Sequence, residues 1–210
     1  MKRAGFTRTQ TARRRMILVR PMNVCVLVGS LRRASFSGML ANALMSLAPS
    51  SMVTEVVEIG QLPFYNQDLE TMIDPPPVPW TAFRQRVKAA DAVLFVTPEY
   101  NRSVPAVLKN ALDVGSRPYG SSVWDRKPGA IVSGSPGAIG AFGANHHLRQ
   151  SLVFLNVPTM QQPEAYVGYV HKLFDEHGKL INDGSRKFLQ EFMHAFANWV
   201  ETIRSQGQRI

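Results

Sequence analysis

The chain has 210 residues, of which 45% are apolar and 19% charged, and it contains one cysteine, Cys25. This composition is typical of a single globular domain and excludes a collagenous or intrinsically disordered chain. One thiol cannot form an internal disulfide framework or a multi-cysteine metal site, and apolar runs such as residues 26–28 are far shorter than the ~20 residues of a membrane span. We therefore expect a cytoplasmic protein with no membrane partner and no metal.

The formal net charge of +9 comes mainly from the beginning of the chain. Residues 1–20 contain seven bases and no acid, which leaves 17 bases and 15 acids in the remainder. A basic arm can contact nucleic-acid phosphates, and an Arg-rich start without acids also resembles an organelle transit peptide. We favour two simpler interpretations of residues 1–21: a disordered leader, or a start codon assigned upstream of Met22. The nearly neutral remainder argues against nucleic acid as a partner.

Apolar runs and helical patterns alternate from residue 22 onwards. A strand is predicted at 23–28, a helix at 36–47, a second strand at 53–59, a long loop over the five prolines of residues 60–79, and a helix at 80–90. Further strands are predicted at 92–96, 129–132 and 157–160, and further helices after Ser103 and Pro105, at 148–155 and at 183–203. This alternation predicts one α/β domain over residues 22–204, with a parallel sheet.

The loop after the first predicted strand has the residues of a phosphate receptor. Ser30, Ser35 and Ser37 offer hydroxyl groups, the following helix start offers free N–H groups, and Arg32 offers a planar cation. The loop lacks both the Gly-Lys-Ser/Thr ending of a Walker loop and the G-x-G of a dinucleotide fingerprint. An ordinary capped loop remains the alternative.

Two more loops follow the third and fourth predicted strands, and ligands of such sheets bind at the carboxyl ends of the strands. In residues 97–105, Tyr100 stands between Glu99 and Asn101, a combination that could hold a flat heterocycle or form a rigid surface turn. Residues 133–143 have a glycine at every third position from Gly134, which permits close approach of a ligand or a neighbouring chain, or a flexible turn. Pro136 directly after Ser135 argues against a nucleophile elbow.

Together, three sequence motifs resemble one known family. They are Gly-Ser-Leu-Arg-x-x-Ser-Phe at 29–36, Pro-Glu-Tyr-Asn-x-Ser-x-Pro-x-x-Leu-Lys-Asn-Ala-x-Asp at 98–113 and His-Leu-Arg-Gln at 147–150. The chain resembles the NADPH-dependent FMN reductases over residues 22–203, and most closely their chromate and quinone reductase branch. The resemblance implies a flavodoxin-like three-layer sandwich with a five-stranded parallel sheet in the order 2-1-3-4-5.

The resemblance also implies a cofactor, a reaction and a set of binding residues. Bound FMN would accept two electrons from NAD(P)H and pass them, in a ping-pong cycle, to a quinone or to another oxidant such as chromate. No side chain is assigned a catalytic role, because this chemistry belongs to the flavin. The predicted FMN-binding residues are Ser30, Leu31, Arg32, Ser35, Phe36, Ser37, Pro98, Glu99, Tyr100, Asn101, Ser103, Ser133, Gly134, Ser135 and Gly137.

Two positions depart from the family pattern. Ser37 stands where the family usually has Asn, and Gly143 lies near a position where relatives carry an arginine involved in contacts between subunits. Members of the family are dimers or tetramers, so we expect a homodimer or homotetramer. An electron carrier of the flavodoxin type and a flavoprotein of the arsenical-resistance type remain alternatives. The sequence does not distinguish NADH from NADPH as the donor.

Overall fold

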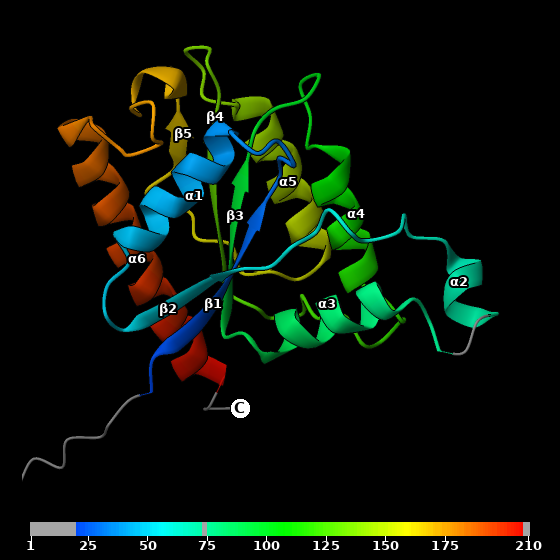
Figure 1. The fold of residues 1–210 in the computed structure, drawn as a ribbon. Coiled ribbons are helices and arrows are strands. Elements are labelled where there is room, and N and C mark those ends of the chain that lie inside the picture. The colour runs from blue at the N-terminus through cyan, green and yellow to red at the C-terminus, as the bar shows by residue number, and fades with distance from the viewer. Residues whose placement is uncertain (1–19, 73–74, 208–210) are drawn as a thin grey trace, which may run out of the picture.

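The computed structural model describes residues 20–72 and 75–207, which form a three-layer α/β sandwich (Figure 1). Five parallel strands form one sheet in the order β2-β1-β3-β4-β5. The strands are β1 (Met22–Val28), β2 (Met52–Val56), β3 (Ala92–Thr97), β4 (Gly129–Gly134) and β5 (Ala165–Val167). The helical elements are α1 (Phe36–Ser46), α2 (Gln67–Thr71), α3 (Val78–Ala89), α4 (Ala106–Gly115), α5 (Phe142–Phe154), the 3-10 turn η1 (Val170–Lys172) and α6 (Asp183–Gly207). The predicted fold class and strand order are confirmed.

Alternate side chains of the central strands enter two separate cores. Val24 and Val26 of β1 pack with α1 and α6, whereas Cys25 and Leu27 pack with α3, α4 and α5 on the other face. Figure 1 shows these two helical layers on opposite sides of the sheet. Because helices cover both faces, every residue of β3 is buried, which explains the continuous apolar runs in the sequence.

The fifth strand lies later in the chain than the sequence predicts. The prediction of a strand at 157–160 is wrong, because β5 is Ala165–Val167. Thr159 forms only an isolated bridge with Gly129, and the ladder with β4 begins where Val132 pairs with Ala165. Pro158 and Pro163 have no N–H to donate to such a ladder, so the chain between them meets the sheet only at this bridge.

Three other elements differ from their predicted boundaries. Strand β2 ends at Val56, although the N–H of Val57 still donates to Val26 O at 3.0 Å. The proline-rich loop contains the short helix α2, which Asn66 caps by accepting from the N–H of Asp68. Helix α5 begins at Phe142, six residues before the predicted start at 148. Its first turn contains Gly143 and few apolar residues, so no amphipathic period marks it.

A partly buried carboxylate ties both ends of the described chain to the amino end of the sheet. Asp91 accepts two hydrogen bonds of 2.8 Å from Arg20 and one of 2.8 Å from the N–H of Asn23, and Arg204 of α6 lies 3.7 Å away. Burial by itself would raise the pKa of Asp91, but these donors and cations hold it below its usual value. Residues 1–19, where most of the predicted basic leader falls, lie outside the described residues.

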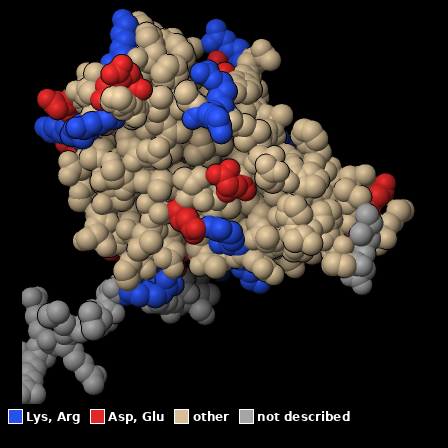
Figure 2. Space-filling view, in the orientation of Figure 1, with Lys and Arg blue, Asp and Glu red and all other residues tan. Residues whose placement is uncertain are grey.

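Surface charges and helix hydropathy bear on the predicted partners. On the described part of the face in Figure 2, basic and acidic side chains are interspersed and no continuous basic patch forms. Within residues 20–72 and 75–207, no helix combines the length and the apolar character that a bilayer crossing requires.

Candidate functional site

Three loops meet at the carboxyl ends of β1, β3 and β4. The order of the sheet reverses between β1 and β3, so the β1–α1 loop leaves the sheet in one direction and the β3–α4 loop in the other. Ligands of doubly wound folds bind in the crevice at this switch point. Gly29 lies at its base, and a Cβ there would approach both Pro98 and Thr97 to 3.2 Å, so the two loops touch through a glycine.

The β1–α1 loop combines a helix start with two arginines. Ser35 is the N-cap of α1, and its hydroxyl accepts from the N–H of Gly38 at 3.0 Å. The N–H groups of Phe36 and Ser37 belong to the first turn and have no acceptor inside the helix. The loop therefore presents free N–H donors at the positive end of a helix dipole, which is the arrangement that binds anions.

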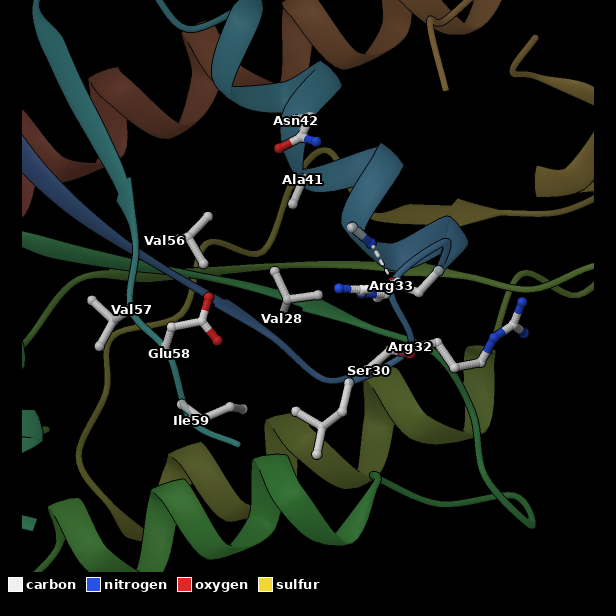
Figure 3. Close-up of a pocket in the computed structure, with 13 residues that line it drawn as sticks. Val28, Ser30, Arg32, Arg33, Ala41, Asn42, Val56, Val57, Glu58 and Ile59 are labelled. Atoms are coloured by element: carbon white, nitrogen blue, oxygen red, sulfur yellow. Dashed lines mark hydrogen bonds between the residues drawn. The ribbon is translucent and has the colours of Figure 1, made fainter. Parts of the chain in front are cut away.

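Arg32 and Arg33 are adjacent in sequence but extend to opposite sides of this loop (Figure 3). Arg32 is exposed, and its guanidinium donates a hydrogen bond of 3.5 Å to Ala34 O. Arg33 extends instead toward an open pocket of about 340 Å³ between the loop, α1 and the end of β2. Arg32 also lines this pocket, so the two arginines flank the loop from opposite sides.

The β3–α4 loop forms a strained two-residue turn. The N–H groups of Tyr100 and Ser103 each donate to the other residue's carbonyl at 3.0 Å. Between them, Asn101 and Arg102 both have positive φ, of 50° and 65°. Such a turn favours Asn-Gly, and an arginine in the left-handed region costs about 1–2 kcal/mol. The turn leaves the Tyr100 side chain 48% exposed at the site.

Helix α5 holds this strained turn at two points. A carboxylate oxygen of Glu99 accepts from the N–H of Ala144 at 3.1 Å, and Ser103 Oγ lies 3.0 Å from His147 Nδ1. We expected the Ser103 hydroxyl to cap the helix that follows it, and this prediction is wrong, because α4 begins at Ala106 after Pro105 and no side chain caps it. The contact between Ser103 and His147 could not be predicted from the sequence, since 44 residues separate the two.

Glu99 and the backbone of Arg102 occupy the space beside Gly143. A Cβ at this position would lie 2.9 Å from Glu99 Oε2 and 3.1 Å from the carbonyl oxygen of Arg102. Helix α5 follows Ala141 in the left-handed region and has no cap from its own flanking residues. Glu99 therefore supplies the anion that the helix start favours, and a larger residue at position 143 would displace it.

The β4–α5 loop is bonded to its own strand and to β5. Ser133 is fully buried, where its hydroxyl donates to Gly140 O at 2.8 Å and accepts from Asn145 Nδ2 at 3.2 Å. The N–H of Ser135 donates to Val167 O at 3.1 Å. Gly140 has a φ of 59°, and a Cβ on it would lie 2.4 Å from the backbone of Tyr166, so only glycine fits there. Ser133 thus supports the loop from below, and Ser135 and Gly137 form its outer part.

A surface cluster beside this loop was not predicted from the sequence. His146 Nε2 lies 2.9 Å from the hydroxyl of Tyr166, and the ring of Phe142 packs against both side chains, with centroids 4.2 and 5.1 Å away. Burial, and then the carboxylate of Glu164, raise the pKa of Tyr166 to about 12. The phenol therefore keeps its proton at neutral pH and can donate a hydrogen bond. The strand β5 that carries Tyr166 was itself misplaced in the prediction.

Comparison with known proteins decides the family. Residues 22–172 match the family described as NADPH-dependent FMN reductase. The chain belongs to the NADPH-dependent FMN reductase family. A quinone reductase of Pseudomonas putida is 59% identical over 183 residues, which are 87% of this chain and 97% of that protein. A 2-hydroxy-1,4-benzoquinone reductase of a Burkholderia species is 49% identical over 183 residues, or 87% and 98% of the two chains.

A solved structure confirms that this family's fold extends over nearly the whole described chain. The flavoenzyme NAD(P)H:(acceptor) oxidoreductase of Paracoccus denitrificans superposes with a TM-score of 0.80 at 39% identity, covering 86% of this chain and 98% of its own. The resemblance that the sequence motifs indicate is therefore confirmed, and with it the assignment as an NAD(P)H-dependent flavin reductase.

Proposed function

We propose that this FMN reductase family member is an NAD(P)H:quinone oxidoreductase that works by a ping-pong cycle. The observation that carries the proposal is the meeting of three loops at the switch point, with anion donors on one and an exposed tyrosine on the next. The relatives named quinone reductase support a quinone as the acceptor. Chromate is a second acceptor to assay, because a flavin site that is open to solvent would accept oxidants of different shapes.

The donor groups of the β1–α1 loop fit the phosphate of FMN. Phe36 and Ser37 present N–H groups, Ser30 adds a hydroxyl and Arg32 adds a charged fork that matches a phosphate. Leu31 and Ser35 complete this loop, where the Ser35 hydroxyl holds the helix start in place. The remaining predicted residues would contact the flavin ring. They are Pro98, Glu99, Tyr100, Asn101 and Ser103 on one side, and Ser135 and Gly137 on the other, while the buried Ser133 and Gly134 would support that second loop.

The chain's own residues would bind and orient the reactants. When bound, FMN supplies the acceptance of a hydride and the later release of two electrons. Glu99 and His147 would keep Tyr100 in a fixed position at the proposed flavin site, because they hold the turn from both sides. Donor and acceptor would use the same open face in turn, which is why a ping-pong order follows. We assign no side chain as a catalytic acid or base.

An exposed apolar surface supports a homodimer or homotetramer. Val153 and Phe154 at the end of α5 are 78% and 89% exposed, and Tyr119 after α4 is 93% exposed. Contiguous apolar side chains at the surface, such as those of the chain neighbours Val153 and Phe154, mark contact sites with other chains. The groove between α4 and α5 that Phe154 borders also contains Ser103 and His147, so a second subunit there would lie next to the site.

The visible absorption spectrum of the purified protein tests this proposal. We expect a flavin spectrum that is bleached by anaerobic NADPH and restored by a quinone. A flavin that NADPH cannot reduce would support an electron carrier and overturn the reductase assignment. A protein that takes up no flavin even after addition of FMN would overturn the three-loop site as a whole. Size-exclusion chromatography with light scattering on the same sample tests the dimer or tetramer.

A further inference from the structure

An aromatic cluster lies on the surface between the start of α5 and β5. It consists of Phe142 and His146 of α5 and Tyr166 of β5, none of which is among the residues proposed to bind FMN. The ring centroid of Phe142 lies 4.2 Å from that of His146 and 5.1 Å from that of Tyr166. His146 and Tyr166 stack with an angle of 21° between their planes. The three rings therefore form one continuous aromatic surface.

The aromatic cluster is exposed and has a fixed arrangement. Phe142 is 48% exposed, whereas Phe95 in β3 is fully buried, so packing of the core does not explain why an aromatic residue begins α5. The hydrogen bond of 2.9 Å between His146 Nε2 and the Tyr166 hydroxyl holds the two rings that Phe142 packs against. An exposed apolar surface of this kind gains free energy when a ligand covers it, and a preformed one loses less entropy on binding.

The aromatic cluster borders the proposed flavin site. Because the strands are parallel, the loops after β3 and β4 and the end of β5 lie at the same edge of the sheet (Figure 1). A Cβ on Gly140 would lie 2.4 Å from the backbone of Tyr166, and one on Gly143 would lie 3.1 Å from the carbonyl oxygen of Arg102. Phe142 lies between these two contacts in the chain, so the cluster stands where the β4–α5 loop meets the strained turn.

We propose that the aromatic cluster binds the ring of the quinone acceptor, with Phe142 in contact with the ring and His146 and Tyr166 as positioning residues that hold Phe142. The inference deepens the proposed function and rests on it, because it concerns the acceptor of that reaction. A quinone ring is flat, uncharged and electron-poor, and the face of an aromatic side chain is electron-rich, so the two attract each other when they stack.

This assignment predicts a choice among acceptors. The ring of Phe142 offers neither a charge nor a hydrogen bond, so a hydrated anion such as ferricyanide gains nothing from contact with it. A naphthoquinone has a larger ring system to stack than a benzoquinone and should gain more. Loss of the cluster should therefore slow the reaction with quinones in proportion to their ring area and leave the reaction with ferricyanide unchanged.

Reoxidation of the FMN-loaded protein tests the proposal. The flavin is reduced anaerobically with dithionite and mixed by stopped flow with a naphthoquinone, a benzoquinone or ferricyanide. We expect Phe142→Ala to lower the second-order rate constant for the naphthoquinone about 3- to 10-fold, and that for ferricyanide by a factor of less than about 2. Phe142→Tyr keeps the ring and should keep the wild-type rate constants. His146→Ala should slow the naphthoquinone reaction about 2- to 4-fold, again without an effect on ferricyanide.

Two further measurements separate quinone binding from a structural role. Equilibrium dialysis of the naphthoquinone against the oxidised protein avoids turnover, and Phe142→Ala should raise the Kd by a factor similar to the change in rate. Val78→Ala removes a 71% exposed apolar side chain at the start of α3 and is the control, for which all these values should stay at the wild-type level.

Three outcomes would contradict one proposal or the other. Equal losses with the naphthoquinone and ferricyanide in Phe142→Ala would overturn the assignment, because they would show that the ring supports the flavin site as a whole. A changed particle mass of Phe142→Ala in light scattering would also overturn it, in favour of a contact with a second copy of the chain. Failure of NADPH to reduce the flavin would instead contradict the proposed function, since dithionite replaces NADPH in this test.

Discussion

The β1–α1 loop and the β3–α4 loop border the same site but are held in place in different ways. In the first, Ser35 caps its own helix through Gly38, and its N–H donates to Arg32 O at 3.2 Å, so the hydrogen bonds of its helix start are local. In the second, Glu99 and Ser103 contact residues 45 and 44 positions away on α5. The first loop is relaxed, whereas the second contains Asn101 and Arg102 at positive φ.

This difference shows how the protein can keep a strained turn at its site. A left-handed arginine persists only where the surrounding structure imposes it. Here the start of α5 does so, because it receives the Glu99 carboxylate as its cap and offers His147 to Ser103. The turn that presents Tyr100 therefore depends on tertiary contacts, while the helix start of the anion-binding loop is held by residues within one helical turn.

We expect the largest effect when the cation Arg32 is removed from the β1–α1 loop. Arg32→Ala should eliminate a charge-assisted bidentate contact worth about 1.5–3 kcal/mol, which raises the Kd for FMN about 10- to 100-fold. Fluorescence titration of the apoprotein with FMN measures this change. Arg33→Ala is the matched control and should leave the Kd near the wild-type value. An unchanged Kd in Arg32→Ala would show that this arginine does not bind the phosphate.

Removing the long-range contact of the second loop should have the next largest effect. Glu99→Ala deprives α5 of its cap from a side chain that is only 12% exposed, and we expect the free energy of unfolding to fall by about 1–2 kcal/mol. Urea denaturation followed by circular dichroism gives this value. Glu55→Ala, which removes an exposed ion pair with Arg86, serves as the control and should change stability by less than about 1 kcal/mol. Equal effects of the two variants would contradict the capping role of Glu99.

The corresponding local cap should matter somewhat less. Ser35→Ala removes the hydroxyl that accepts from Gly38, and the expected loss of stability is about 1 kcal/mol. Ser35→Asp keeps an acceptor at the N-cap and should restore stability, while its negative charge should weaken FMN binding. The same urea and fluorescence measurements separate these two effects. Stability that stays at the wild-type level in Ser35→Ala would show that the first loop does not depend on this cap.

The smallest effect should be a gain in stability. Arg102→Gly relieves the left-handed conformation, and because glycine loses more backbone entropy on folding, we expect a net stabilisation of about 0.5–1 kcal/mol. Arg33→Gly, at a position without positive φ, should instead destabilise the protein. A loss of stability in Arg102→Gly would mean that its contact with Glu99, at 3.4 Å, outweighs the strain.

Much of the fold could be predicted from the sequence, because its signals are local. The strands β1, β3 and β4 are short apolar runs, and burial between two helical layers requires such runs whatever their neighbours are. β5 gave no such signal, since its three residues acquire their strand conformation only by pairing with β4. The start of α5 was missed for a similar reason, because its cap is Glu99 from another loop.

The sequence by itself determined the family and the anion-binding character of the first loop, because both depend on residues that are close together in the chain. Only the tertiary structure decided that Glu99 caps α5, that Ser103 meets His147 and that Arg33 and Glu58 border one pocket. These partners lie on different elements, and only packing of the helices against the sheet brings their side chains together. The residues that give the site its chemistry are therefore recognisable in short stretches of sequence, whereas the positions of their side chains depend on how the helices pack against the sheet.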